Sequence, residues 1–266
     1  MKGFLLSLQS EFYKSRKTLG FWSAILLPLL ITALVTVGFY ANAAKMAPAP
    51  PVLLWAQYAG VSLGIMGTLL LPMFLVFIAY SVNNMEHKAD TWKTLFTLPI
   101  ARWSIYSAKY VFILMLTLLS LALFAGLTIG FGNLLSVLKP ELKFDQGNIN
   151  DALLQIYAKL FLSALGILSI QFLLSLIWSD FLKPMGIGFV GTITGVILGG
   201  NKWEYAYLLP YSHPLLAIMG MAGGKKSKAA SGMNIEIFTK EIIVSLIVAA
   251  VVFVAGYFIV KRKSIK

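Results

Sequence analysis

Few side chains in this sequence are able to perform covalent or metal chemistry. The 266 residues contain no cysteine and only two histidines, His87 and His213, which lie far apart. The lack of thiols excludes disulfides, thiolate metal sites and cysteine nucleophiles, and two distant histidines argue against a metal centre. The serines and threonines of the apolar stretches have no histidine or carboxylate beside them. An intramembrane protease or lipid-modifying enzyme is therefore not supported.

The sequence also lacks the residues that would supply energy for transport. No phosphate-binding loop of the form G-x-x-x-x-G-K-[ST] occurs, and Gly223-Gly224-Lys225-Lys226 does not have its spacing. No expected span carries an acidic or basic residue at its centre, although proton- and ion-coupled pumps usually keep one there. We therefore predict that this chain is not an enzyme and binds no cofactor or metal of its own.

The composition is that of a membrane protein. Hydrophobic residues make up 59% of the chain and charged residues 12%, whereas ordinary soluble domains contain about 25% charged residues. The formal net charge of +12 would favour a nucleic-acid partner in a soluble protein. Here lysine and arginine flank long apolar runs, as the positive-inside rule describes, and no nucleic-acid partner is expected.

Six apolar runs are candidates to cross a bilayer, because a span needs about 20 mostly apolar residues. The sequence thus predicts an all-α integral membrane protein with a single transmembrane domain over residues 1–266. The first run is also compatible with a signal peptide cleaved near Ala41-Asn42-Ala43, but it is longer than such apolar regions usually are, so an uncleaved span is expected. The predicted spans are 19–41, 57–82, 107–132, 155–178, 184–200 and 242–260.

The positive charges predict the orientation of the spans. With both termini in the cytoplasm, 13 of the 22 lysines and arginines fall in the cytoplasmic segments, as the positive-inside rule requires. Five of the remaining nine lie in one long external loop, where charge has little influence on orientation. The cytoplasmic residues are Lys2, Lys14, Arg16, Lys17, Lys88, Lys93, Arg102, Lys109, Lys183, Lys261, Arg262, Lys263 and Lys266.

Two external loops have distinct characters. Residues 42–56 contain three prolines and are expected to form a short, stiff connector. Residues 201–241 begin with an aromatic and apolar stretch that two prolines interrupt, so a full span is excluded. This stretch predicts an interfacial or partly re-entrant segment, with aromatic rings at the depth of the lipid headgroups. These rings belong to Trp203, Tyr205, Tyr207 and Tyr211.

A polar insert over residues 86–99 separates the second and third spans. Asn83-Asn84 is placed to cap a helix, and Pro99 is placed to end it. The apolar residues between them recur every three to four positions and so share one helical face. This face would fit a groove on a soluble partner or lie on lipid with a tryptophan anchor. Its residues are Ala89, Trp92, Leu95, Phe96 and Pro99.

The N-terminal residues 3–18 predict an amphipathic helix that lies flat on the membrane before the first span. Its apolar stripe contains Phe4, Leu5, Leu8, Phe12 and Tyr13, and its polar residues are Gln9, Glu11, Lys14, Arg16 and Lys17. Such a helix serves as an interfacial anchor, and this role is compatible with contact to a partner.

Glycines in the fifth span leave one helical face bare. Gly191, Gly195 and Gly199 recur at every fourth position, after Gly186 and Gly188, and this spacing lets another helix approach closely. The groove would pack against the same chain, pack against a second copy, or line a pathway.

Taken together, these features resemble the membrane subunits of ABC-2 type transporters, in particular the small bacterial permeases of lantibiotic and bacitracin immunity. The resemblance covers nearly the whole chain. It is carried by Glu11 and Lys14 in S-E-F-Y-K-S-R-K, by the pattern E-x4-T-W-K-x-L-x-x-L-P-x-x-R from Glu86 to Arg102, and by Lys109.

The resemblance implies that the insert 86–99 is a coupling helix that docks on a separate P-loop ATP-binding subunit, two copies of which carry ATP and Mg²⁺. Glu86 and Arg102 would bracket this helix as a polar clamp. The N-terminal helix would be the family's connecting helix, which also touches the ATPase. The residues implied in coupling are Glu86, Thr91, Trp92, Lys93, Leu95, Phe96, Pro99 and Arg102, and those of the connecting helix are Leu8, Glu11, Phe12 and Lys14.

The same resemblance implies a pair of permeases, identical or paralogous, in a bacterial cytoplasmic membrane. Spans one, two and five would meet across this dimer, and Gly191, Gly195 and Gly199 would belong to its interface or pathway. The cargo would be a peptide antibiotic or another amphipathic compound, exported for immunity. The external loop is modest and no ATPase is fused to the chain, unlike in larger relatives. The alternative is a non-transporting membrane scaffold or sensor that signals through the insert.

Overall fold

The computed structural model describes residues 2–89, 91–97, 99–144, 150–222 and 235–262. Within these residues the regular elements are helical, and six helices are long and apolar enough to cross a membrane. The prediction of an all-helical protein with six spans is therefore confirmed. The spanning helices are α2 (Leu19–Ala41), the continuous run Pro51–Lys88, α7 (Arg102–Leu138), α8 (Asn150–Ile177), α9 (Leu182–Gly200) and α11 (Lys240–Arg262).

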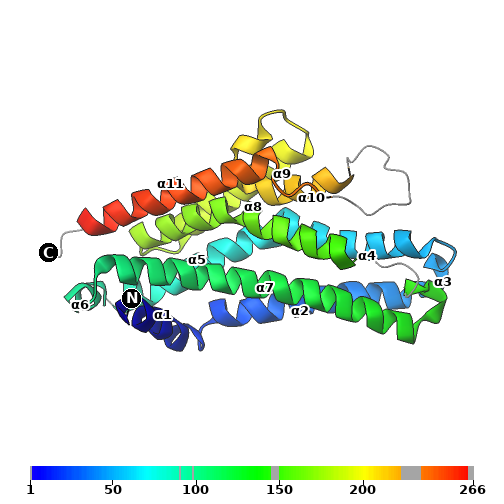
Figure 1. Ribbon diagram of the computed structural model, residues 1–266, viewed down its shortest axis with the longest axis horizontal. Coiled ribbons are helices and arrows are strands. Elements are labelled where there is room, and N and C mark those ends of the chain that lie inside the picture. The colour runs from blue at the N-terminus through cyan, green and yellow to red at the C-terminus, as the bar shows by residue number, and fades with distance from the viewer. Residues whose placement is uncertain (1, 90, 98, 145–149, 223–234, 263–266) are drawn as a thin grey trace.

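The long helices run side by side along the longest axis of the molecule (Figure 1). The short helix α6 (Trp92–Thr97) lies at one end of the bundle, and α3 (Ala43–Met46) lies at the other. Helix α1 (Lys2–Ser15) and the end of α11 are both found at the α6 end. Both described chain ends thus lie at one end, as an even number of crossings requires. Lys263 and Lys266, which contribute to the charge count, lie outside the described residues.

Several helices continue beyond the spans expected from hydropathy. The second span, expected at 57–82, is part of a helical run formed by α4 (Pro51–Ile65), the π-helical turn η1 (Met66–Leu70) and α5 (Leu71–Lys88). Proline at the start of α4 has the backbone angle that a first helical turn needs. The stiff connector expected at 42–56 is therefore mostly helical. Helix α7 has 37 residues and is about 55 Å long, so it extends beyond a hydrocarbon core of about 30 Å.

The spans differ in how much of their surface the chain itself covers. The most apolar window of α8 is 61% buried, whereas those of α9 and α11 are 28% and 22% buried. Helix α8 packs against α5, α7 and α11. Helix α8 therefore forms the centre of the bundle, and α9 and α11 form its periphery.

The segment between α9 and α11 folds back into the bundle. It contains the short helices η4 (Ala206–Leu208) and η5 (Pro210–Ser212), followed by α10 (His213–Ala222), which packs against α8, α9 and η1. Backbone hydrogen bonds from Leu209 N to Ala206 O (3.1 Å) and from Ser212 N to Leu209 O (3.0 Å) satisfy the turns between them. Irregular backbone at membrane depth needs this cover by protein.

The aromatic residues of this segment do not share one environment. Trp203 and Tyr205 are 48% and 49% exposed, as expected for rings at headgroup depth, but Tyr211 is 6% exposed. The Gln171 side chain on α8 donates a hydrogen bond to the Tyr211 hydroxyl (2.5 Å). The prediction that Tyr211 lies at headgroup depth is therefore wrong, because a buried amide partner draws its ring inside the bundle.

A largely buried ion pair joins α8 and α11, which pack against each other. Lys159 Nζ lies 3.4 Å from Glu241 Oε1, and the two side chains are 5% and 12% exposed. We expect Glu241→Gln to destabilise the protein by ~3 kcal/mol, because Lys159 would keep a buried charge without its partner. Thermal unfolding of the purified protein in detergent measures this loss. The control is Glu141→Gln in the half-exposed pair Lys139–Glu141 (3.8 Å), where less than ~1 kcal/mol is expected. Equal falls in melting temperature for Glu241→Gln and Glu141→Gln would contradict the interpretation that burial makes the loss of Glu241 more costly.

Candidate functional site

Helix α1 turns its polar face toward the bundle. Ser7, Glu11 and Ser15 are buried, at 8%, 3% and 1% exposure, whereas Leu5 and Phe12 are 61% and 48% exposed. The buried residues recur every four positions and the two exposed residues are seven positions apart, so each set follows one side of the helix. The helix is amphipathic, but an acidic side chain and two hydroxyls face the protein, and of the predicted apolar stripe Leu5, Phe12 and Tyr13 face outward while Phe4 and Leu8 are half-buried.

Glu11 enters a buried ion cluster of four residues, which also contains Lys14 of α1, Glu86 of α5 and Lys109 of α7. Lys14 Nζ lies 2.7 Å from Glu11 Oε1 and 2.8 Å from Glu86 Oε1. Lys109 Nζ lies 2.9 Å from Glu11 Oε2 and 2.6 Å from Glu86 Oε2. Each carboxylate therefore bridges both ammonium groups, and the cluster is a closed ring of alternating charge with no net charge.

Lys109 has the most complete set of partners in the ion cluster. The residue is 0% exposed, and besides the two carboxylates its ammonium donates to the Val82 carbonyl (3.4 Å). An ammonium group has three donors, and all three are used. Removing a charge from water costs several kcal/mol per ion, so this lysine is stable in the interior only while its two carboxylate partners remain.

Lys14 is the member of the ion cluster that reaches the surface, with a side-chain exposure of 32%. Burial lowers the pKa of Lys14, but the carboxylates of Glu11 and Glu86 outweigh burial and raise the pKa above its ordinary value. A raised lysine pKa contributes stability that is fully present below the ordinary value of about 10.4 and is lost only above it. Lys14 therefore keeps its proton, and with it its ion pairs to Glu11 and Glu86, throughout the physiological pH range.

The first residue of α6 packs against the ion cluster. The Lys109 ammonium lies 5.6 Å from the centre of the Trp92 ring, a distance at which a cation is attracted to an aromatic face. Trp92 also lines a small hollow beside Lys109, together with residues of α7, α8 and α11. The indole thus points into the bundle.

A hydrogen-bond chain continues from Trp92 into the bundle. Trp92 Nε1 donates to His87 Nδ1 (3.2 Å), and His87 Nε2 lies 3.0 Å from the Ser175 carbonyl on α8. Indole nitrogen is only a donor, so Nδ1 of His87 must accept. The proton of the neutral ring therefore sits on Nε2, which donates to Ser175. Through this chain α6 is connected to α8 as well as to the ion cluster.

Asn83 also connects α5 to α8. This contact corrects the expected role of Asn83 as a helix cap. Helix α5 continues through Asn83 to Lys88, and the Asn83 amide donates to Ser175 Oγ (2.8 Å). The residue is 0% exposed. The local sequence favours a cap, but the tertiary partner on α8 keeps the helix continuous at this position.

The other predicted coupling residues surround α6. Thr91 is half-buried and its amide donates to Glu86 O (3.1 Å), while Leu95 is half-buried and Pro99 is exposed. The side chains of Lys93 and Phe96 lie outside the described part of the structure. Of the two residues predicted to bracket the insert as a polar clamp, Glu86 pairs with the two lysines and Arg102 donates to the Lys261 carbonyl (3.2 Å) on α11, and the clamp stays a prediction.

Among the predicted connecting-helix residues, Glu11 and Lys14 lie in the ion cluster, Leu8 is half-buried against the core, and Phe12 faces outward. Sequence reasoning missed the pairing of Lys109 with both glutamates and the role of His87. One signal was available, because a charged residue just inside an apolar run needs a buried partner of opposite charge.

The glycine face of α9 is filled from within the same chain. A Cβ at Gly191 would lie 2.8 Å from the Tyr211 ring, one at Gly195 would lie 2.5 Å from the Tyr211 backbone, and one at Gly199 would lie 3.1 Å from Leu215. The segment from η5 to α10 thus occupies the bare groove, as the first of the three alternatives states. Packing within the same chain thus accounts for Gly195 and Gly199, which are buried, in place of the predicted dimer interface, whereas Gly191 is half-buried.

Comparison with known families identifies the chain. A family model described as ABC-2 family transporter protein matches residues 7–195. The chain belongs to this family. All four residues of the ion cluster, α6 and most of α9 fall within the matched part of this ABC-2 protein. No curated protein and no solved structure matches the sequence.

Membership of the ABC-2 family fixes the general role of the protein. It is a multi-pass membrane permease component of an ABC transporter, and such components work with an ATP-binding ABC partner.

The contact between Trp92 and the ion cluster leads to a direct prediction for this ABC-2 protein. We expect Trp92→Ala to release α6 from the bundle while the six spans stay folded, because it removes both the ring over Lys109 and the bond to His87. Limited proteolysis should then cut near residues 92–97 several times faster, with little change in the melting temperature. The control, Trp103→Ala, removes a 44% exposed tryptophan at the start of α7 and should leave cleavage at α6 unchanged.

Proposed function

We propose that this chain forms the translocation path of an ATP-driven exporter, together with a second permease that is identical or paralogous. Two copies of a separate ATP-binding subunit would dock at the α6 end, which would face the cytoplasm of a bacterial cell. ATP-driven closure of these subunits would move the permeases between inward-facing and outward-facing states. ATP and Mg²⁺ would be held by the partner, because no phosphate-binding loop occurs in this sequence.

The ion cluster is the observation that carries this proposal. It joins α1, α5 and α7 through four short ion pairs, and Trp92 lies on its surface. A displacement of α6 would therefore be transmitted to α1, α5 and α7 together. Packed side chains and ion-pair networks of this kind can carry energetic coupling between a docking element and moving helices.

The structure changes the part that Trp92 plays in this proposal. Because its ring faces the bundle, Trp92 would transmit movement and would not itself form the docking surface. The outward side of α6 offers Thr94 and Thr97, both exposed, followed by the exposed Pro99. We place the docking contact on these residues.

The cargo is proposed from the resemblance to immunity permeases. A peptide antibiotic or another amphipathic compound would be exported across a bacterial cytoplasmic membrane. The apolar and uncharged centres of the spans are consistent with such a cargo, because they offer no ionisable residue to bind an ion or a proton.

Single cysteines provide the test, since the natural chain contains none. Thr94→Cys and Thr97→Cys should each cross-link to the ATP-binding subunit when the two proteins are produced together. On intact cells, a membrane-impermeant maleimide should leave both cysteines unlabelled. The matched control is Lys45→Cys, an exposed position in α3 at the opposite end, which should be labelled from outside and should not cross-link.

The outcomes separate the two parts of the proposal. Labelling of Thr94→Cys from outside would reverse the orientation and remove the docking site. Correct labelling without a cross-link, combined with unchanged ATP hydrolysis on adding the permease, would favour a scaffold or sensor that does not couple to the ATPase.

A further inference from the structure

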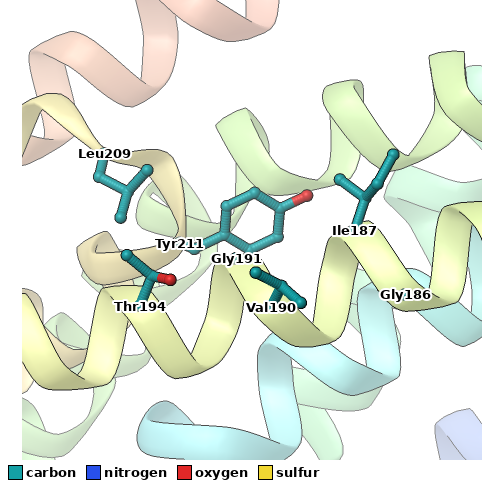
Figure 2. Close-up of a pocket in the computed structure, with 7 residues that line it drawn as sticks. All are labelled: Gly186, Ile187, Val190, Gly191, Thr194, Leu209 and Tyr211. Atoms are coloured by element: carbon teal, nitrogen blue, oxygen red, sulfur yellow. The ribbon is translucent and has the colours of Figure 1, made fainter.

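A buried histidine lies in the folded-back segment, at the point where η5 passes into α10. Figure 2 shows the Tyr211 ring of this segment lying over α9 at Gly191. Two residues further on, α10 begins at His213, and the His213 side chain is 0% exposed. The position of this histidine is therefore tied to the seating of the segment on the glycine face of α9.

The hydrogen bonding of His213 requires the neutral ring. Its Nε2 lies 2.8 Å from the Tyr207 carbonyl, which can only accept, so Nε2 carries the proton. Nδ1 is buried and has no hydrogen-bond partner among the described residues. A protonated ring has a donor at each nitrogen, so acid would create a second N–H without an acceptor. Leaving a buried donor unpaired is costly, and more so when the group is charged.

The nearby ion pair does not supply a free counter-ion for a protonated His213. Glu241 on α11 attracts a positive charge on this histidine. Its carboxylate is already engaged, because it lies 3.4 Å from Lys159 Nζ on α8 and accepts a hydrogen bond from the Thr239 hydroxyl. The pair of Glu241 and Lys159 has no net charge, so it compensates little of a new charge on His213.

The remaining titratable groups of the surrounding elements do not change this balance. Lys240 lies 5.6 Å from the centre of the Tyr207 ring, which places a further positive charge close to the hydrogen-bond partner of His213. The phenols of Tyr207 and Tyr211 stay neutral in acid. Helix α4 and η1 carry no charged side chain, and Lys183, the charged residue of α9, lies in its first turn. The charged residues of the adjoining loops are exposed, and these are Lys202, Glu204 and Glu236.

We propose that His213 is a pH switch: its neutral ring holds the folded-back segment on α9, and its protonation in acid releases the segment. Because α11 ends at the α6 end of the bundle, the segment that precedes α11 adjoins the opposite end. The proposed function places that end outside the cell, so the switch responds to external acid and uncovers Gly195 and Gly199. The switch does not depend on the docked ATPase, and its failure would leave the proposed function intact.

Single cysteines in the otherwise cysteine-free chain measure this release in nanodiscs. Ala217→Cys places a thiol in α10 at a position that is 1% exposed. Its rate of reaction with maleimide is divided by that of Lys45→Cys, an exposed position, at the same pH, which cancels the pH dependence of the reagent. From about pH 7.5 to about pH 5 this ratio should rise by up to ~30-fold, because the released histidine binds a proton with a pKa of about 6.5.

His213→Gln is the matched variant, because its amide N–H can donate to the Tyr207 carbonyl and does not titrate. In this background the ratio should change by less than about twofold over the same pH range. Ala164→Cys, in α8 and 0% exposed, is the second reporter. It should stay unreactive at both pH values, which separates release of the segment from acid unfolding of the whole bundle.

Three results would overturn the switch. An unchanged ratio in the chain that carries His213 would show that acid does not release the segment. A full rise that persists in His213→Gln would assign the titration to another group, such as Glu241. A parallel rise at Ala164→Cys would mean that acid unfolds the bundle as a whole. If the melting temperature shows that His213→Gln does not fold, the same comparison is made with His213→Asn.

Discussion

Replacing Lys109 with methionine is expected to be the most damaging single change at the α6 end of this protein. The variant leaves Glu11 and Glu86, which are 3% and 2% exposed, facing each other with Lys14 as their one remaining cation in the ion cluster. Breaking a buried pair by removing one partner costs about 3–5 kcal/mol. Thermal unfolding in detergent should show this loss, and proteolysis should show release of α1.

Two companion variants make this result specific to the ion cluster. Lys14→Met removes a lysine whose side chain is 32% exposed, so water can replace it and a clearly smaller loss is expected. The double variant Lys109→Met with Glu86→Gln removes one charge of each sign, and should recover part of the stability lost in Lys109→Met alone. Equal losses for Lys14→Met and Lys109→Met would mean that the buried ring of charges does not hold the helices together.

Gly195→Ala is expected to displace the folded-back segment from α9. The new Cβ would lie 2.5 Å from the backbone carbon of Tyr211 and 2.7 Å from Ser212 N, and backbone cannot rotate away as a flexible side chain can. Overpacking of this kind typically costs about 1–3 kcal/mol. The melting temperature should fall, and a cysteine at Ser212, a buried position, should react faster with maleimide in the Gly195→Ala background.

Gly186→Ala is the matched control on the same helix. A Cβ at Gly186 meets nothing within 4 Å, and alanine is favoured over glycine in a helix by about 1 kcal/mol, so this variant should be neutral or slightly stabilised. The two alanine substitutions therefore have opposite expected signs. A similar response of both would show that the glycines act through helix propensity and not through close packing.

The amphipathic pattern of α1 illustrates the limit of prediction from local sequence. Periodicity identifies two faces of the helix, and it is correct that Leu5 and Phe12 share one of them. It does not say which face meets the protein, because lipid accepts an apolar face as readily as a protein core does. Only the position of Lys109 and Glu86 brings Glu11 and Lys14 to the inner side of α1.

Asn83 and Tyr211 show the same limit in another form. The neighbouring residues in the chain predict a helix cap at Asn83 and an interfacial ring at Tyr211. Both are buried against α8, where Ser175 and Gln171 supply hydrogen-bond partners. A buried polar group must find a partner, and this requirement outweighs the weaker local preference.

The sequence by itself determined that this chain crosses the membrane with six helices and that it carries no phosphate-binding loop. Both conclusions depend on properties of short windows: the length and polarity of an apolar run, and the spacing of a motif. The tertiary structure decided which charges pair and what fills the glycine face of α9. Those outcomes depend on contacts between residues 72 and 98 positions apart in the ion cluster, and local hydropathy and periodicity carry no information about which distant residues will meet.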